Sequence, residues 1–235
     1  MNLLAIIQAA ASALTLPTPS AVVGSADANA LQLLELANNE GRDLARRYPW
    51  QALIRQATFT TTGVESQGTI TTIAGTDFRY ILDGTFYNRS TGLEIPGPIS
   101  AEDYQSSVAA GVTGPTPAYR LRGNTLLLLP APEAGESCAF EYVSRNWCSN
   151  SSGSTTRDAF VTDQDLCLVD DELVLLGVMW RWRKAKGFEY SEEFMQYERQ
   201  VADAMARDGG KSCVSLGGWD GEGDAANAIN RTIGA

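Results

Sequence analysis

The chain changes its sequence pattern twice, and this limits the folds that it can adopt. Residues 1–56 and 157–210 space their apolar side chains three and four positions apart, which is typical of amphipathic helices. The intervening segment, residues 57–156, is rich in Thr, Gly, Pro and aromatic residues in short β-prone runs. Its turns are too short for crossover connections, so its strands are expected to be antiparallel. The sequence therefore predicts an α+β protein in which a β-rich insertion interrupts a helical domain.

The first part of the helical domain predicts two helices. Residues 2–14 place their apolar side chains on one face and form a short amphipathic helix. A signal peptide is the alternative, but a basic n-region is missing and Gln8 interrupts the apolar run. The second helix starts near Ser25, a candidate N-cap, and stops at Pro49. Gly41 on its apolar face indicates the close approach of another helix.

The second part of the helical domain predicts an αα-hairpin. Acidic residues at 170–172 start the third helix, and Gly187 follows the cations of its last turn. Ser191 is the expected cap of the fourth helix, which ends at Gly209. Residues 211–235 are rich in Gly and Asp and lack a period, so we expect an extended C-terminal arm that orders only against a partner. No apolar run reaches the eighteen residues of a transmembrane helix.

The insertion contains six β-prone runs that turn signals separate. One unit predicts a hairpin that turns at Gly123-Asn124. The expected strands are Thr58–Thr62, Thr69–Ile73, Phe78–Leu82, Ala118–Leu121, Thr125–Leu129 and Ala139–Ser144.

The chain contains no histidine, which removes the Ser-His-Asp and Cys-His nucleophile systems and the His-ligated zinc sites. Its four cysteines include no CxxC pair, so scattered reduced thiols are favoured over a zinc site. The formal net charge of −10 argues against a surface that grips nucleic acid throughout. We expect no catalytic residue, no cofactor and no metal site.

Three local patterns have both a chemical and a structural interpretation. The run Trp180–Lys186 interleaves cations with aromatic rings, as some DNA-binding modules do, but a buried helix face with cations at its C-terminus explains it better. The carboxylates at 102–103 and 170–172 could serve a cell-wall hydrolase as acid and base, although charges at a helix start explain the second group. Asp220–Asp224 is acidic like a metal loop but lacks the spacing of an EF-hand, which favours a solvated tail.

Several segments, taken in order, resemble the head–tail adaptor proteins of tailed bacteriophages. The similarity covers roughly residues 2–210, and the tail beyond Gly210 has no counterpart. The segments that carry it are Asp27–Gly41, Arg47–Trp50, Thr85–Gly92, Gly97–Ser100, Tyr119–Asn124, Leu129–Pro132, Phe140–Ser144 and Leu176–Tyr190.

This resemblance implies a helical bundle with a β-sandwich-like insertion and no catalytic residues. It implies a cyclic homo-oligomer, usually of twelve copies, that docks between the portal protein and a tail or nozzle protein in the virion neck after synthesis in the host cytoplasm. DNA would pass through the ring without sequence-specific binding, helped by the acidic net charge, and no membrane contact is expected. The candidate interface residues are Leu4, Ile7, Leu14, Trp180, Arg181, Trp182, Arg183, Trp219, Ile229 and Ile233.

Overall fold

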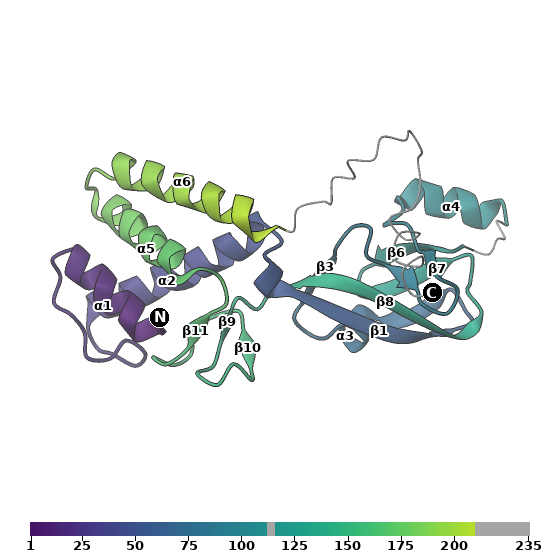
Figure 1. The fold of residues 1–235 in the computed structure, drawn as a ribbon, viewed down its shortest axis with the longest axis horizontal. Coiled ribbons are helices and arrows are strands. Elements are labelled where there is room, and N and C mark those ends of the chain that lie inside the picture. The colour runs from purple at the N-terminus through teal and green to yellow at the C-terminus, as the bar shows by residue number, and fades with distance from the viewer. Residues whose placement is uncertain (112–115, 210–235) are drawn as a thin grey trace, which may run out of the picture.

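The computed structural model describes residues 1–111 and 116–209, and its helices and antiparallel sheets confirm the α+β class. A helical lobe and a β lobe lie side by side along the long axis of the molecule (Figure 1). The predicted arm, residues 211–235, lies outside the described residues. The four main helices of the helical lobe are α1 (Leu3–Ala13), α2 (Ala28–Arg47), α5 (Asp171–Lys186) and α6 (Ser191–Asp208).

The ends of these helices agree with the sequence for α5 and differ for α2 and α6. At the start of α5, Asp170 accepts a hydrogen bond from the Glu172 N–H, and Gly187 ends the helix with a φ of +75°. The N-cap of α2 is Asp27, not Ser25, because the Asp27 carboxylate accepts the Asn29 N–H at 2.9 Å. Ser191 does not cap α6 but is its first helical residue.

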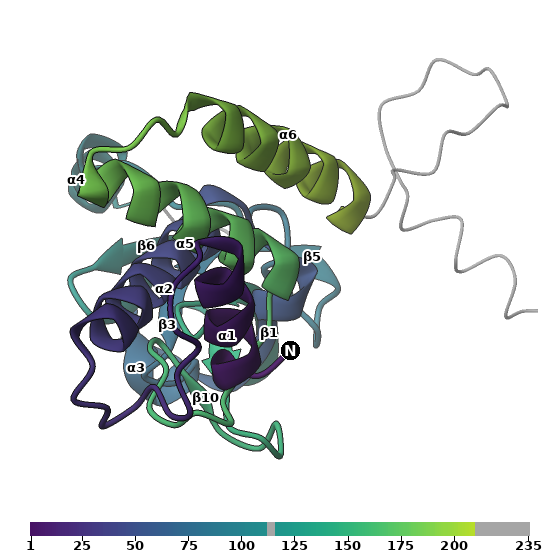
Figure 2. The same cartoon turned by 90° about the vertical axis from the view of Figure 1, so that its left-hand side faces the viewer.

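The helical lobe has a hydrophobic core of its own, to which α1, α2, α5 and α6 all contribute. Figure 2 shows α5 between α6 on one side and α1 and α2 on the other. Trp147 and Cys148 also belong to this core, and the Trp147 ring meets Phe160 edge-on at 4.7 Å. A small antiparallel sheet closes the lobe, made of β9 (Cys148–Ser149), β10 (Thr156–Arg157) and β11 (Leu166–Cys167).

The packing of Trp147 bears on where one domain ends and the other begins. The sequence pattern places residues 147–156 with the insertion, whereas the side chains of Trp147 and Cys148 pack with the helices. The division at 57 and 156 stays a prediction, and this packing favours a second boundary near Asn146.

The β lobe consists of two antiparallel sheets that share one apolar core. Side chains of both sheets meet there, for example Phe86 and Phe140 at 5.1 Å and Phe86 and Tyr119 at 5.2 Å. The first sheet contains β1 (Ile54–Thr62), β8 (Ala134–Ser144), β3 (Phe78–Ile81), β4 (Tyr87–Asn88) and β5 (Leu93–Glu94), and the second contains β2 (Ser66–Thr69), β7 (Thr125–Leu129) and β6 (Ala118–Arg122).

The β lobe contains two short helices that the sequence pattern did not predict. The expected strand over Thr69–Ile73 is wrong, because only Thr69 is extended and α3 (Ile70–Ile73) follows it. The second is α4 (Ala101–Ala109), whose N-cap Ser100 accepts the Asp103 N–H at 3.0 Å. The hairpin at Gly123-Asn124 is confirmed, since β6 pairs with β7 across it.

Gly41 lies on α2 where the indole of Trp147 approaches the backbone, so the expected close neighbour is this ring and not another helix. A methyl group at position 41 would overlap the ring, which is fully buried. Overpacking of this kind costs about 1–3 kcal/mol, more than the ~1 kcal/mol by which Ala favours a helix over Gly.

We therefore expect Gly41→Ala to lower the free energy of unfolding by about 1–2 kcal/mol. Urea unfolding followed by tryptophan fluorescence measures this change. Glu35→Ala, on the exposed face of the same helix, is the control and is expected to shift stability by no more than about 0.5 kcal/mol. Equal stabilities of Gly41→Ala and the wild-type protein would contradict the role given to the ring.

Candidate interaction surfaces

The centre of the helical lobe is a buried polar cluster that joins three helices. Glu40 of α2 is fully buried and accepts hydrogen bonds from the Arg181 Nε of α5 at 2.6 Å and from the Tyr197 hydroxyl of α6. Arg181 also donates through Nη2 to Asp43 at 2.5 Å. The carboxylate fits because α5 has Gly177 opposite it, where any added Cβ would overlap the Glu40 side chain.

The burial of this cluster shifts the pKa values of its members. Burial raises the pKa of Glu40, and the hydrogen bonds from Tyr197 and Arg181 only partly oppose this effect. The pKa of Tyr197 is raised by burial and by the neighbouring Glu40 charge. Burial acts to lower the pKa of Arg181, but the bonds and charges of Glu40 and Asp43 outweigh it and the net direction is upward. The cluster holds the three helices together, because its charged groups form ion pairs and hydrogen bonds with one another.

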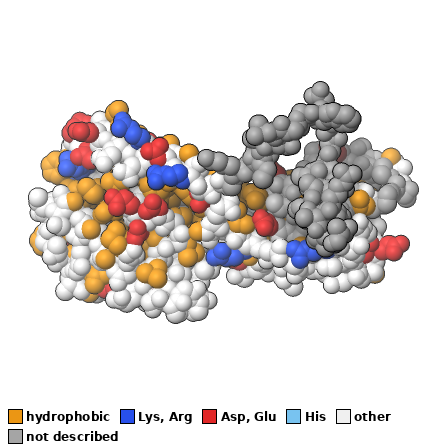
Figure 3. All heavy atoms as spheres, viewed as in Figure 1, with side chains coloured by type: hydrophobic (Ala, Val, Ile, Leu, Met, Phe, Trp, Pro, Cys, Tyr) orange, Lys and Arg blue, Asp and Glu red, His pale blue; other side chains and the backbone are white. Residues whose placement is uncertain are grey.

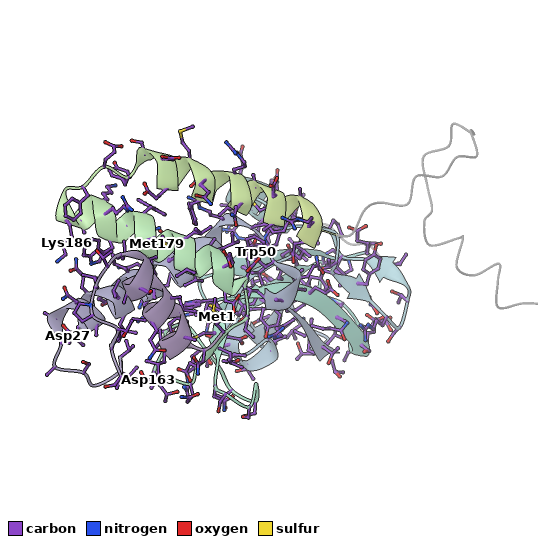
Figure 4. The ribbon with its side chains drawn as sticks, turned by 60° about the vertical axis from the view of Figure 1, so that its left-hand side comes forward. Met1, Asp27, Trp50, Asp163, Met179 and Lys186 are labelled. Atoms are coloured by element: carbon purple, nitrogen blue, oxygen red, sulfur yellow. The ribbon has the colours of Figure 1, made fainter. Side chains whose placement is uncertain are left out.

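Two aspartates hold the start of α1, because the Asp165 carbonyl accepts the Leu3 N–H at 2.9 Å and the Asp163 carbonyl accepts the Leu4 N–H at 3.1 Å. Their side chains in turn bind backbone N–H groups of the neighbouring loops. Asp165 is fully buried and accepts bonds from Val161 and Thr162, with Arg157 as its ion-pair partner at 3.1 Å. Burial acts to raise the Asp165 pKa, yet these bonds hold it below its ordinary value. Asp163 lies beneath α1 (Figure 4) and accepts the Val23 N–H at 2.7 Å.

Four of the seven predicted interface residues that the structure describes are buried in the chain's own core, namely Ile7, Leu14, Trp180 and Trp182. Ile7 and Leu14 are buried, and Leu4 packs against the same cluster while partly exposed. Trp180 is buried, with its ring edge-on to Phe194 at 5.0 Å. The remaining candidates Trp219, Ile229 and Ile233 lie outside the described residues.

The cations of the Trp180–Lys186 run also serve the chain itself. Arg181 is held by Glu40 and Asp43, and Arg183 pairs with Glu193 of α6 at 3.0 Å. Lys184 lies 5.7 Å from the centre of the Trp180 ring. The structure therefore uses this run to pack α5 against α6, as the buried-face interpretation predicts.

Three of the predicted residues, Leu14, Trp182 and Arg183, line one hollow at the surface. The hollow measures about 380 Å³, and Phe188 lines it too. The Trp182 and Phe188 rings stack at 5.9 Å with an interplanar angle of 27°, and Phe188 is 57% exposed. This hollow lies at the end of the lobe where α5 turns into α6.

A second hollow at the same end of the α5–α6 hairpin was missed by the sequence analysis. It measures about 350 Å³ and is lined by Trp180, Tyr190, Phe194 and Met195 among others. Met195 is 63% exposed. We call Phe188, Met195 and the two hollows the hairpin tip. The apolar residues within Phe188–Met195 are the sequence signal, but helix periodicity alone could not show that Phe188 and Met195 stay exposed. Figure 3 shows other apolar side chains scattered over this lobe.

The carboxylate groups considered for catalysis act as helix ends. Glu102 and Asp103 lie in the first turn of α4, and Asp170 caps α5. Among the described residues, no group of three acidic or cysteine side chains is arranged to hold a metal ion. Cys138 and Cys148 are buried, and burial raises the pKa of the Cys138 thiol to about 11.

Within the described part of the chain, no helix has the length and apolar character needed to cross a membrane.

The fold is a helical bundle with an antiparallel β insertion. The family model described as SU10 adaptor protein matches residues 1–216. The chain therefore belongs to the SU10 adaptor family of phage head–tail adaptor proteins, which confirms the resemblance seen in its sequence. No curated protein matches the sequence.

The raised pKa of Glu40 gives a prediction for the pH dependence of stability. A group whose pKa is higher in the folded than in the unfolded state stabilises the fold most at a pH below its unfolded pKa. This contribution to the free energy of unfolding is lost as the pH rises through the folded pKa. Glu40→Gln cannot ionise. The unfolding free energy of the wild type minus that of Glu40→Gln should therefore decrease between pH 4 and pH 8.

Urea unfolding at several pH values measures this difference. Glu35→Gln, which changes an exposed carboxylate on the same helix, should remain parallel to the wild type across the range. A wild-type advantage that grows with pH would show that the ion pair with Arg181 outweighs burial.

Proposed function

We propose that this adaptor is a structural subunit of the phage neck and not an enzyme. Copies of the chain form a cyclic ring, twelve in number, between the portal protein and a tail or nozzle protein, and the genome passes through the central channel. The subunit joins the virion in the host cytoplasm. The observation that carries the proposal is the match of the SU10 adaptor family model to residues 1–216 of the chain.

The distribution of surfaces on the subunit supports a ring. A closed ring needs two different, complementary surfaces on each copy, since its interfaces are heterologous. The two lobes lie side by side, each with its own core (Figure 1), and so offer chemically distinct flanks. Their net negative charge favours free passage of DNA through the channel.

We place one contact with a neighbouring protein at the hairpin tip. Phe188 and Met195 are the most exposed large apolar side chains of the helical lobe, and both border a hollow. Exposed aromatic and Met side chains are enriched in protein interfaces. The interface residues of the sequence analysis contribute here through Leu14, Trp180 and Trp182, which form the floor beneath the exposed pair.

The ring is tested by mixing the protein with the portal of the same phage and examining the product by negative-stain imaging and native mass spectrometry. We expect an added symmetric ring of twelve copies per portal. A chain that stays unbound to the portal over a range of salt concentrations would overturn the proposal. Wall-degrading activity of the purified chain would instead favour the hydrolase.

The hairpin tip gives a second prediction. Phe188→Ser combined with Met195→Ser should reduce portal-dependent assembly at least tenfold, because the two substitutions remove the most exposed large apolar side chains of the helical lobe from the contact. Val64→Ser removes an equally exposed apolar side chain (56%) from the β lobe and serves as the control. Unfolding midpoints should be unchanged in both proteins, and wild-type assembly by the double variant would exclude the tip from the interface.

A further inference from the structure

A positively charged groove lies where the two lobes meet, and its charge is not neutralised by the rest of the described chain. We define the arginine groove by the side chains that line it, Arg42, Arg46, Arg79 and Arg145, together with Ala45 and Asp158. We propose that this groove binds the acidic segment Asp220–Asp224 from a copy of the same chain. This goes beyond the adaptor function and does not depend on it.

The groove is built from both lobes. Arg42 and Arg46 come from the last turns of α2, Arg79 from β3, and Arg145 from the end of β8. The Arg79 Nη1 donates to the Ala45 carbonyl at 2.5 Å, and the Arg145 Nη2 donates to the Phe78 carbonyl at 3.0 Å. These bonds hold two guanidinium groups in place at the rim of a concave space of about 290 Å³.

The arginines of the groove differ from those elsewhere in the described chain. Arg47, Arg157, Arg181 and Arg183 each pair with a carboxylate, whereas none of the four groove arginines has a carboxylate oxygen of a described residue within 4.0 Å. Other unpaired arginines occur on the described surface, but these four line one and the same hollow. Burial, together with the charge of Arg46, lowers the pKa of Arg79. The four arginines carry four positive charges. The C-terminal dipole of α2 neutralises about half of one charge, and the Asp158 carboxylate neutralises one more. Roughly two and a half positive charges remain.

A short acidic peptide fits this groove better than duplex DNA does. Sequence-independent binding of DNA relies on many phosphate contacts spread along a surface, while the groove concentrates its charge in one small concavity. The net charge of −10 repels a polyanion at long range. A segment tethered to the chain avoids this penalty because its effective concentration is high. Guanidinium groups bind carboxylates through two parallel hydrogen bonds.

The C-terminal segment has both the charge and the reach. Asp220, Glu222 and Asp224 carry three carboxylates within five residues, without an intervening cation. The last described residue, Gly209, packs against the Tyr48 hydroxyl, and Asp208 accepts the Gln51 N–H at 2.7 Å. The described chain thus ends at the junction of the lobes, beside Tyr48, and Tyr48 is two residues along the sequence from Arg46. Eleven further residues lead to Asp220 and span up to about 36 Å.

The test is a zero-length crosslink in the full chain. In an Arg46→Lys variant, a carbodiimide joins the new amine to any carboxylate in contact with it, and peptide mass spectrometry identifies the partner. We expect the major crosslink to join position 46 to a carboxylate of residues 220–224. Mixing isotopically labelled and unlabelled copies shows whether the segment comes from the same copy or from a neighbour, and either origin supports the proposal.

The matched controls change cations and leave the acidic segment as it is. Removing two neighbouring cations with Arg42→Gln and Arg145→Gln should reduce the crosslink at least tenfold, because the carboxylates of residues 220–224 stay reactive but lose the charge that attracts them. Arg199→Lys, on an exposed face of α6, should not form it. A crosslink to Asp158 alone would overturn the proposal. Duplex DNA affinity that Arg42→Gln with Arg46→Gln abolishes, and that Arg89→Gln with Arg199→Gln preserves, would replace the peptide with DNA as the ligand.

Discussion

The packing of the helical lobe depends on the hydrogen bonds that the buried Glu40 carboxylate accepts from Arg181 and Tyr197. An unpaired carboxylate in a protein interior costs several kcal/mol, so the fold must bring Arg181 and Tyr197 to it at the same time. Those partners come from α5 and α6, and the approach of α5 requires Gly177. One side chain of α2 therefore specifies the register of two other helices. Apolar contacts between the same helices would tolerate small shifts that this polar cluster does not.

The junction of the lobes follows from the end of α2. The last carbonyls of a helix lack partners within it, and here two side chains from later in the sequence supply them. The Trp50 Nε1 donates to the Leu44 carbonyl at 2.8 Å, and Arg79 of the β lobe donates to Ala45. The chain enters the β lobe after α2 and returns to the helical lobe after β8, at Trp147. The Trp147 ring fills the space that Gly41 leaves on α2. Both connections between the lobes therefore contact the same helix, α2.

The sequence predicted elements whose signals are local and missed those that depend on tertiary contacts. Asp170 and Gly187 mark the ends of α5, and the apolar run Thr125–Leu129 between two turn signals predicts the bounds of β7, because caps and turns act within a few residues. By contrast, α3 begins within a β-prone run. The candidate interface residues stay a prediction, and the sequence could not show that Ile7 and Trp180 are buried, because an apolar residue has the same pattern whether it faces the core or a partner. Only the packing of α5 against α6 shows that Phe188 and Met195 remain exposed.

The arginines illustrate how position decides the role of one residue type. Arg181 has a side chain that is only one-fifth exposed and is fully used by Glu40 and Asp43, so it stabilises the fold and has little left to offer a partner. Arg46 has the same chemistry at the exposed end of a helix and has no ion-pair partner among the described residues. Exposed charges cost little to leave unpaired, because water solvates them. A cluster of such charges is then retained at small cost to folding, and its attraction remains available for binding. Four arginines that are unpaired among the described residues line one hollow at the junction of the lobes, whereas the arginines of the Trp180–Lys186 run are held in ion pairs, and we therefore place anion binding at the junction.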